Sequence, residues 1–429
     1  MNLIDGKVYE TGTCDEILDN LENRVVQTLA KDTLDTNTVI DACDRLVTNL
    51  DETIYLEAMQ QLGIDESLGR SYLKEAREMF SGENLRHRMK TELGEYYGKP
   101  ITYKPPSMKN AVTEKIVPLG VLLHIAAGNA DGLPTFSVLE GLLAGNINIL
   151  KIPAAEGGIS IRLLLELIKV EPSLSEYIYV FDYSSKDIVH IGKLIDAADA
   201  VVVWGGIEAV SAFRNLISPN IKLIEWGHKI SFGYVTKAGI SDEKLTELAK
   251  NIAETGQLLC SSCQGIFFDT DDFGEVHEFC ERFLPLLEST ISEKAKLLGI
   301  DVKSKTALQL YCSELETIYN DNKIFRGQNC SLTAVNNSIL ESSIQFGNLW
   351  VKPLPKSELL KSIRPYKNYL QTVGLCCGNE EKIELCELLS KTGVIHICPG
   401  NRMSTTYPGA AHDGEYPLRR YTKVVSIEA

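Results

Sequence analysis

The stretch Ala144-Gly-Asn-Ile-Asn-Ile-Leu-Lys-Ile-Pro153 places a short apolar, β-branched run directly after the apolar pattern of a helix over Leu133–Leu143. Short apolar runs flanked by Gly and Pro are typical of buried strands, so we predict a strand over Ile147–Ile152. The same alternation of apolar strand and helix runs from Glu114 to Val235, with a further helix over Ser160–Ile168. This alternation predicts a mostly parallel sheet covered by helices on both faces, an architecture often used to bind nucleotides. The other expected strands are Lys115–His124, Tyr177–Phe181, Ala200–Trp204, Lys222–Glu225 and Ser231–Val235.

Helices precede this region. Residues 14–96 carry apolar side chains at three- and four-residue spacing with charges between them, which predicts a helical N-terminal region. The segment Lys99–Lys109 contains three prolines and predicts an irregular connection.

A second α/β region follows. A helix is expected over Asp242–Thr255, and the α/β pattern then continues from Cys260 to about Cys398, with strands near Gln264–Phe268 and Tyr369–Leu375. The alternating segment Tyr421–Ile427 predicts a C-terminal strand that could pair with the sheet edge of a partner.

Composition limits the function. The chain has 429 residues, and 43 Lys and Arg against 58 Asp and Glu give a net charge of −15. Such a field repels nucleic-acid phosphates and anionic lipid surfaces, so we expect no nucleic-acid partner. We find no secretory signal and no apolar run long enough to span a membrane, which predicts a cytoplasmic protein whose 11 cysteines are mostly reduced and buried.

Several common motifs are absent. No glycine lies two positions from another, so the usual dinucleotide fingerprint is missing, and no phosphate loop ending in G-K-[ST] occurs. Cys260-Ser-Ser-Cys263 has no second ligand pair, and we therefore expect no bound metal. A redox role for this pair is disfavoured because a helix precedes it and a strand follows, the reverse of the thioredoxin-like order.

Two cysteines are candidate nucleophiles. Gly374-Leu-Cys376-Cys-Gly378 resembles a nucleophile elbow with Cys in place of Ser, although glycines at a strand end explain it better. Cys260 lies where a helix enters a loop before an apolar strand, a position where backbone N–H groups can activate a thiol and bind an oxyanion. On these local features alone, an inert structural cysteine explains Cys260 equally well.

The ordered motifs from Val117 to Ile427 resemble the aldehyde dehydrogenase superfamily, in which the nucleophile sits in a G-Q-x-C segment like that around Cys260. The resemblance implies catalytic roles for Cys260, for Asn129 in Ala127-Gly-Asn129 and for Glu225 in Ile224-Glu-Trp-Gly-His-Lys229. It further implies that the cofactor is bound by Lys151, Pro153, Gly205 and Gly206. The segments Val117-Pro-Leu-Gly-Val121 and Gly414-Glu-Tyr-Pro-Leu-Arg-Arg-Tyr-Thr-Lys-Val-Val425 resemble other superfamily signatures.

Within the superfamily, the chain is most similar to the LuxC-type acyl-CoA reductases. The similarity rests on Cys-x-Ser-x-Gln around Cys260, Trp204-Gly-Gly206, Ile363-Arg-Pro-Tyr-Lys-Asn-Tyr-Leu-Gln371 and His412-Asp-Gly414. It implies that an acyl thioester, carried by CoA or by an acyl carrier, is reduced by NAD(P)H to an aldehyde through an acyl-enzyme on Cys260. The alternatives are an aldehyde dehydrogenase that forms acids, and a cysteine acyltransferase or thioesterase that uses no nicotinamide.

Departures from the superfamily pattern refine these expectations. Cys260 follows Gln257 by three positions rather than two, and Ile344-Gln345-Phe-Gly347 has Gln in place of a ribose-binding glutamate. Ala154 stands where NAD-preferring relatives often carry a glutamate, and the loss of that carboxylate favours NADP(H) over NAD(H).

Glu225 has two interpretations. In acid-forming relatives this position activates water, a step that thioester reduction does not need. The alternative is a strand-end carboxylate that pairs with Lys229 or a backbone N–H.

The expected architecture is an aldehyde dehydrogenase-like α/β fold with two domains of parallel or mixed sheet. We expect a helical N-terminal region over residues 1–100, a Rossmann-like NAD(P)-binding domain over 101–256 rejoined by 399–429, and a catalytic domain over 257–398. The resemblance also implies a homodimer or homotetramer.

Overall fold

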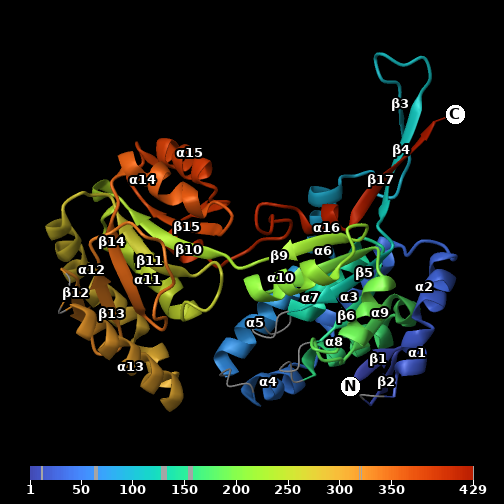
Figure 1. The fold of residues 1–429 in the computed structure, drawn as a ribbon, viewed down its shortest axis with the longest axis horizontal. Coiled ribbons are helices and arrows are strands. Elements are labelled where there is room, and N and C mark those ends of the chain that lie inside the picture. The colour runs from blue at the N-terminus through green and yellow to red at the C-terminus, as the bar shows by residue number, and fades with distance from the viewer. Residues whose placement is uncertain are drawn as a thin grey trace. The chain divides into compact units, whose positions relative to one another are not determined.

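A computed structural model describes residues 1–10, 13–61, 66–126, 133–152, 158–317, 319 and 321–428. The chain forms two compact units (Figure 1). The first comprises Met1–Gly227 and Tyr407–Ala429, and the second comprises His228–Thr406.

The first unit is built on a seven-stranded sheet with the strand order β2-β1-β7-β6-β5-β8-β9. The five neighbouring strands β7, β6, β5, β8 and β9 are parallel to one another. Strands β1 and β2 are antiparallel additions that the sequence did not predict. The strands are β1 (Asn2–Ile4), β2 (Lys7–Tyr9), β5 (Val121–Ile125), β6 (Ile147–Lys151), β7 (Ile178–Phe181), β8 (Ala200–Trp204) and β9 (Lys222–Trp226).

Helices cover both faces of this sheet, as predicted, because successive strand side chains alternate between two apolar cores. Leu122 packs with α3, α6, α7 and α8, whereas Leu123 packs with α1, α2, α9 and α10. The helices are α1 (Asp15–Asp19), α2 (Leu21–Leu29), α3 (Thr36–Thr48), α4 (Glu52–Gln61), α5 (Glu66–Met79), α6 (Gly82–Leu93), α7 (Leu133–Leu143), α8 (Ile159–Val170), α9 (Ile188–Asp196) and α10 (Ile207–Leu216). The helical N-terminal region is therefore part of the first unit.

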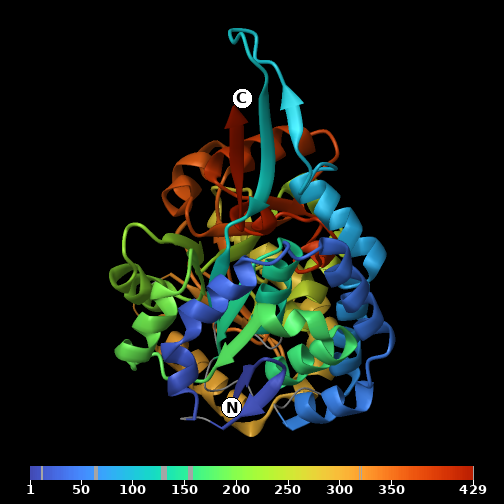
Figure 2. The ribbon, with the colours of Figure 1, turned by 90° about the vertical axis from the view of Figure 1, so that its right-hand side faces the viewer.

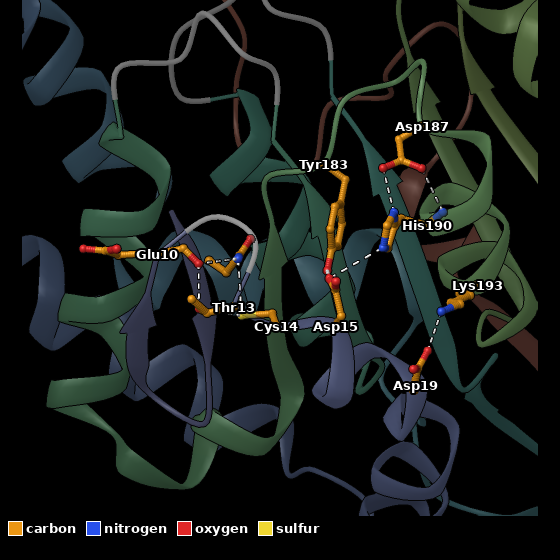
Figure 3. A network of polar contacts seen from close by, with 10 residues as sticks. Glu10, Thr13, Cys14, Asp15, Asp19, Tyr183, Asp187, His190 and Lys193 are labelled. Carbon is orange, nitrogen blue, oxygen red and sulfur yellow. Dashed lines mark hydrogen bonds and ion pairs between the residues drawn. The ribbon is translucent and has the colours of Figure 1, made fainter.

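A polar network joins the N-terminal helix α1 to α9 (Figure 3). The Tyr183 hydroxyl donates a hydrogen bond to Asp15 Oδ1 at 3.1 Å. The His190 ring stacks on Tyr183 with centroids 4.4 Å apart, and its Nδ1 lies 2.6 Å from Asp187 Oδ2. This contact with His190 holds the pKa of the Asp187 carboxyl below its usual value.

A buried chain of hydrogen bonds crosses the core of the first unit. Trp204 Nε1 donates to Ser137 Oγ at 2.9 Å, and Ser137 Oγ lies 2.6 Å from His124 Nδ1. His124 Nε2 lies 3.0 Å from Asn148 Oδ1, an acceptor, so the consistent tautomer carries its proton on Nε2. Burial lowers the pKa of His124 to about 4, and His124 is a satisfied core residue.

A three-stranded sheet with the order β17-β4-β3 extends from the rest of the first unit (Figure 2). Its strands are β3 (Ile101–Tyr103), β4 (Val112–Pro118) and β17 (Thr422–Glu428). The strand expected over Lys115–His124 is instead two strands, since β4 ends before Leu119-Gly120 and β5 enters the large sheet. The segment 99–109, expected to be irregular, contains β3.

The C-terminal strand pairs with its own chain. All seven residues of β17 lie antiparallel to β4, from Thr422 opposite Pro118 to Glu428 opposite Val112. One edge of β17 is thus used within the chain, and the pairing of its other edge with a partner's sheet stays a prediction.

Buried charges anchor the turn before β17, which includes α16 (Pro417–Arg420). Arg88 contacts both Glu92, at 2.5 Å, and Glu140. The backbone N–H of Leu418 donates to Glu92 at 2.9 Å, and the Tyr421 hydroxyl donates to Glu140 at 3.3 Å. These contacts attach the C-terminal segment to helices α6 and α7 of the first unit.

The second unit contains another seven-stranded sheet, with the order β12-β13-β14-β11-β10-β15-β16, parallel except for the β12–β13 pair. Its strands are β10 (Ile230–Val235), β11 (Cys263–Phe268), β12 (Lys323–Arg326), β13 (Ser331–Ala334), β14 (Asn348–Pro353), β15 (Leu370–Cys376) and β16 (His396–Cys398). Its helices are α11 (Asp242–Thr255), α12 (Phe273–Leu297), α13 (Ile300–Thr317), α14 (Lys356–Ile363) and α15 (Lys382–Thr392). Short 3₁₀ helices lie at Pro172–Tyr177 in the first unit and at Lys237–Gly239, Arg364–Tyr366 and Gly400–Arg402 in the second.

The boundaries between the units differ from the expected ones at 256/257 and 398/399. The second unit starts at His228, because β10 pairs with β11 and β15 of that unit. Helix α11, which follows β10 in the chain, therefore also belongs to the second unit. It ends at Thr406, because Gly400 packs against Leu248 of α11. Among the described residues, no helix is long and apolar enough to cross a membrane.

Candidate functional site

Cys260 lies in the loop between α11 and β11, here called the cysteine loop (residues 256–262). The helix ends at Thr255, and both Gly256 and Gln257 adopt the left-handed conformation, with φ of 55° and 64°. This turn redirects the chain so that the loop passes over the end of the sheet of the second unit. All 11 cysteines are described and free, and only Cys260 and Cys312 are exposed. Most of the cysteines are buried, as expected, and Cys312 is an exception besides Cys260.

The alternative nucleophiles are buried. Cys376 is 1% exposed and Cys263 is fully buried, and burial raises the pKa of each thiol to about 12. A neutral, inaccessible thiol cannot act as a nucleophile. The geometry therefore favours Cys260 over the elbow-like Cys376 and over a redox pair with Cys263.

Residues of strands β10 and β15 form hydrogen bonds with Cys260. The hydroxyl of the buried Ser231 donates to the Cys260 carbonyl at 2.7 Å and accepts from the backbone N–H of Thr372 at 2.9 Å. The side-chain amide of Gln371 donates to Cys260 Sγ at 3.3 Å.

Two buried glutamines connect the cysteine loop to the segment Ser343–Gly347. Gln257 Nε2 donates to Ser343 Oγ at 3.0 Å, and Gln257 Oε1 accepts from the Gly347 N–H at 2.9 Å. Gln264 Oε1 accepts from the Ser343 backbone N–H at 3.1 Å, and its Nε2 donates to the Gln257 carbonyl at 2.8 Å. Gln345, at the position of the superfamily's glutamate, therefore lies beside the cysteine loop.

That segment also forms a pocket. Gln345 and Phe346 of this segment, together with Leu258 of the cysteine loop and residues of α13, line a pocket of about 380 Å³.

The predicted cofactor residues that the structure describes lie in the first unit, at the carboxyl ends of parallel strands. Lys151 ends β6, and its side chain is 5% exposed. Burial lowers the pKa of Lys151, and the nearby Asp182 opposes that shift. Ligands of open α/β sheets bind at this edge.

Gly205 and Gly206 connect β8 to α10. Gly206 is the N-cap of α10 and supplies no side-chain cap, so the first N–H groups of the helix are available to an anion. A Cβ at Gly206 would meet no atom within 4 Å, which leaves open space in front of this helix start. The uncapped helix start and the Lys151 cation fit the pyrophosphate and ribose of a dinucleotide.

Glu225, near the end of β9, forms a bidentate ion pair with Arg214 of α10. Arg214 Nε lies 2.9 Å from Glu225 Oε1, and its Nη2 contacts Oε2. Lys229, the partner expected from the sequence, belongs to the second unit, where it donates to the Asn368 carbonyl at 3.1 Å. The structure thus gives Glu225 a side-chain partner, Arg214, that the sequence did not predict.

Two other predicted residues, Asn129 and Pro153, lie outside the described residues, as does Ala154. The structure thus groups Lys151, Gly205, Gly206 and Glu225 in the first unit, and it places Cys260 in the second.

Residues that sequence reasoning did not single out surround Cys260. Gln371 ends the segment Ile363–Gln371 that resembles the acyl-CoA reductases, but no local pattern indicates its contact with Cys260. Ser231 has no local signal, since its contact with Cys260 depends on the pairing of β10.

The fold is aldehyde dehydrogenase-like. The structure of a putative methylmalonate-semialdehyde dehydrogenase from Sinorhizobium meliloti complexed with NAD matches with a TM-score of 0.70 at 13% identity, over 100% of this chain and 97% of that one. Residues 31–424 match the family model described as acyl-CoA reductase (LuxC), and the chain belongs to this family. The expected fold and the expected family are thereby confirmed.

Curated relatives of this family are similar over most of the chain. The long-chain acyl-protein thioester reductase of Aliivibrio fischeri is 25% identical over 328 residues, which are 73% of this chain and 65% of that protein. The enzyme of the same name from Photobacterium phosphoreum is 25% identical over 331 residues, 73% of this chain and 64% of that protein. The match thus covers less than two thirds of each relative's length.

Proposed function

We propose that the protein reduces an acyl thioester to an aldehyde through a covalent acyl-enzyme on Cys260. The observation that carries this proposal is the exposed Cys260 thiol, fixed through its backbone by Ser231 and at its sulfur by Gln371. The membership of the family and the thioester reductases among its relatives support the substrate class.

The first step is the attack of the Cys260 thiolate on the thioester carbonyl. The carbonyl oxygen becomes an oxyanion, which the Cys260 backbone N–H and the Asn129 side-chain amide would hold, each such donor contributing about 3 kcal/mol. The thiol of the carrier then leaves, and the acyl group stays on Cys260. When bound, the reduced nicotinamide supplies the hydride that converts this acyl group to the aldehyde.

Lys151, Pro153, Gly205 and Gly206 would hold the cofactor. The Lys151 ammonium would bind the adenosine ribose, and the start of α10 would bind the pyrophosphate. We propose NADP(H) rather than NAD(H), since Ala154 places no carboxylate against a 2′-phosphate. These local groups would bind the anionic cofactor although the net charge of the chain, −15, repels it.

The ion pair between Glu225 and Arg214 favours thioester reduction over acid formation. Both carboxylate oxygens of Glu225 accept hydrogen bonds from the Arg214 guanidinium, so the carboxylate is engaged in an ion pair rather than directed at a water molecule. We therefore propose a structural role for Glu225.

The test is to incubate the protein with acyl-CoA and NADPH or NADH, and to follow nicotinamide absorbance, released thiol and products. We expect oxidation of the nicotinamide with stoichiometric aldehyde, and a lower KM for NADPH than for NADH. Free acid without nicotinamide oxidation would instead identify a thioesterase, and acid formed from aldehyde with NAD(P) reduction as the faster reaction would identify an aldehyde dehydrogenase.

A further inference from the structure

The sulfur of Cys260 has a neighbour that lies 111 positions later in the chain. Gln371, on β15, is 8% exposed, and its Nε2 donates to Cys260 Sγ at 3.3 Å. A primary amide carries no charge at any pH in the physiological range, so it donates in the same way throughout that range.

A local irregularity of the sheet directs Gln371 toward the cysteine loop. In the parallel β10–β15 pair, Ile230 lies opposite Leu370 and Phe232 lies opposite Val373. Two residues of β15, Gln371 and Thr372, therefore face one residue of β10, Ser231. Such bulges re-aim side chains and are frequent beside active sites.

The same bulge fixes the backbone of Cys260. Ser231 binds the Cys260 carbonyl and the Thr372 N–H through one hydroxyl, at 2.7 and 2.9 Å. Because Thr372 is the neighbour of Gln371, the Ser231 hydroxyl links the backbone of Cys260 to the strand that carries the Gln371 amide.

We propose that Gln371 is a catalytic residue whose side-chain amide stabilises the Cys260 thiolate, the form that attacks the thioester. This inference rests on the proposed function, because it assigns Gln371 its role through the nucleophile. A hydrogen bond to an ionised acceptor is stronger than one to a neutral acceptor, so the amide favours the thiolate over the thiol.

The step balances as follows. The Cys260 thiol loses its proton to water, and the resulting sulfur lone pair forms a bond to the thioester carbonyl carbon. The bond from that carbon to the carrier sulfur breaks, and the carrier leaves as a thiolate that takes a proton from water. No electron is gained or lost until the hydride arrives.

The test measures the rate at which iodoacetamide alkylates Cys260 as a function of pH, by peptide mass spectrometry of the full chain. The variant Gln371→Met keeps the length of the side chain and removes the donor, and Gln371→Glu replaces the donor with a carboxylate. We expect Gln371→Met to move the midpoint of the curve upward by about one pH unit, which is about tenfold slower alkylation at pH 7. Gln371→Glu should move it further.

Two controls separate this effect from misfolding. Cys312, the second exposed cysteine, lies on α13 and should be alkylated at the same rate in every variant. Gln328→Met changes an exposed glutamine in the turn between β12 and β13 and should leave the Cys260 curve unchanged. If Gln371→Met does not fold, the isosteric Gln371→Glu decides.

An unchanged Cys260 curve in a folded Gln371 variant overturns the proposal. The alkylation assay needs neither thioester nor nicotinamide, so its result is independent of turnover. A shifted curve in a protein that reduces no thioester would refute the proposed function alone, and an unchanged curve in an active reductase would refute the role of Gln371 alone.

Discussion

At the scale of single residues, exposure and hydrogen bonding distinguish the cysteines of this chain from one another. Cys260, Cys263 and Cys376 all lie near strand ends, but two of them are sealed in the core. Burial makes their thiols weak acids, and only Cys260 combines access to solvent with a donor at its sulfur.

Glu225 provides the first prediction at this scale. Glu225→Gln weakens an ion pair whose Arg214 side chain is 65% exposed, and such pairs contribute about 0–1 kcal/mol. Because the proposed mechanism gives Glu225 no part in the chemistry, we expect aldehyde formation from acyl-CoA to stay within about threefold of the wild-type rate, which corresponds to less than about 1 kcal/mol in the activation free energy. Steady-state kinetics of the variant measure this.

Arg214→Gln is the matched control, because it breaks the same pair and leaves the carboxylate in place. A loss of a hundredfold or more in folded Glu225→Gln, without such a loss in Arg214→Gln, would show that Glu225 takes part in the chemistry.

What the sequence predicted at this scale depended on local context. Cys260 was found because a helix end, a glycine and a following strand are adjacent in the chain. Gln371 and Ser231 were not found, because their contacts with Cys260 arise only when β10 pairs with β15 and a bulge forms. Arg214 was likewise not found as a partner of Glu225, because the two residues lie on different elements, α10 and β9.

At the scale of elements, the long strand and helix patterns were predicted closely. The helices Leu133–Leu143 and Asp242–Thr255 and the strand Ala200–Trp204 have the expected bounds. The errors fall where tertiary pairing decides. The apolar run at 115–124 continues through Gly120, yet β4 pairs with β17 whereas β5 pairs with β6 and β8.

His124 on β5 gives a prediction of pH dependence. Its pKa is about 4 in the folded protein, because burial disfavours the charged ring, and about 6.5 in the unfolded chain. Between these values the unfolded chain binds the additional proton, so the free energy of unfolding falls as the pH falls from about 6.5 to about 4. The contribution of His124 over this window is about 3 kcal/mol.

Urea unfolding at several pH values between 7 and 4.5 measures this slope. His124→Gln should flatten it, whereas His87→Gln, at an exposed position of α6, should not. An equally steep slope in His124→Gln would show that other groups cause the loss of stability.

At the scale of the whole molecule, two α/β units divide the predicted roles. The residues proposed for the cofactor lie in one unit and the proposed nucleophile in the other. The sequence indicated both units through their alternating patterns. It could not place their boundary, because β10 resembles the strands before it and only its neighbours β11 and β15 assign it to the second unit.

The sheet β17-β4-β3 offers a surface through which copies of the chain could associate. Its strand β17 exposes Val424, Val425 and Ile427, which are 59%, 40% and 56% accessible. Val425 and Ile427 share one face of the strand and Val424 lies on the other, so both faces carry exposed apolar side chains. Such side chains often mark an interaction surface, and we propose that a second copy of the chain covers them to give a homodimer or homotetramer.

Sedimentation velocity tests this assembly. The wild type should sediment as a dimer or tetramer, and Val424→Lys combined with Ile427→Lys should lower its mass. Val26→Lys, on the exposed face of α2, is the matched control and should change nothing. A monomeric wild type, or an unchanged mass in the double variant, would contradict the proposed surface.

The most direct measurement of the proposed chemistry is to mix the protein with a saturated acyl-CoA without nicotinamide, map the adduct, and then add NADPH. We predict one acyl group on Cys260, no adduct in Cys260→Ala, and release of the adduct as aldehyde when NADPH is added. An adduct on another cysteine, or its release only as free acid, would contradict thioester reduction through Cys260.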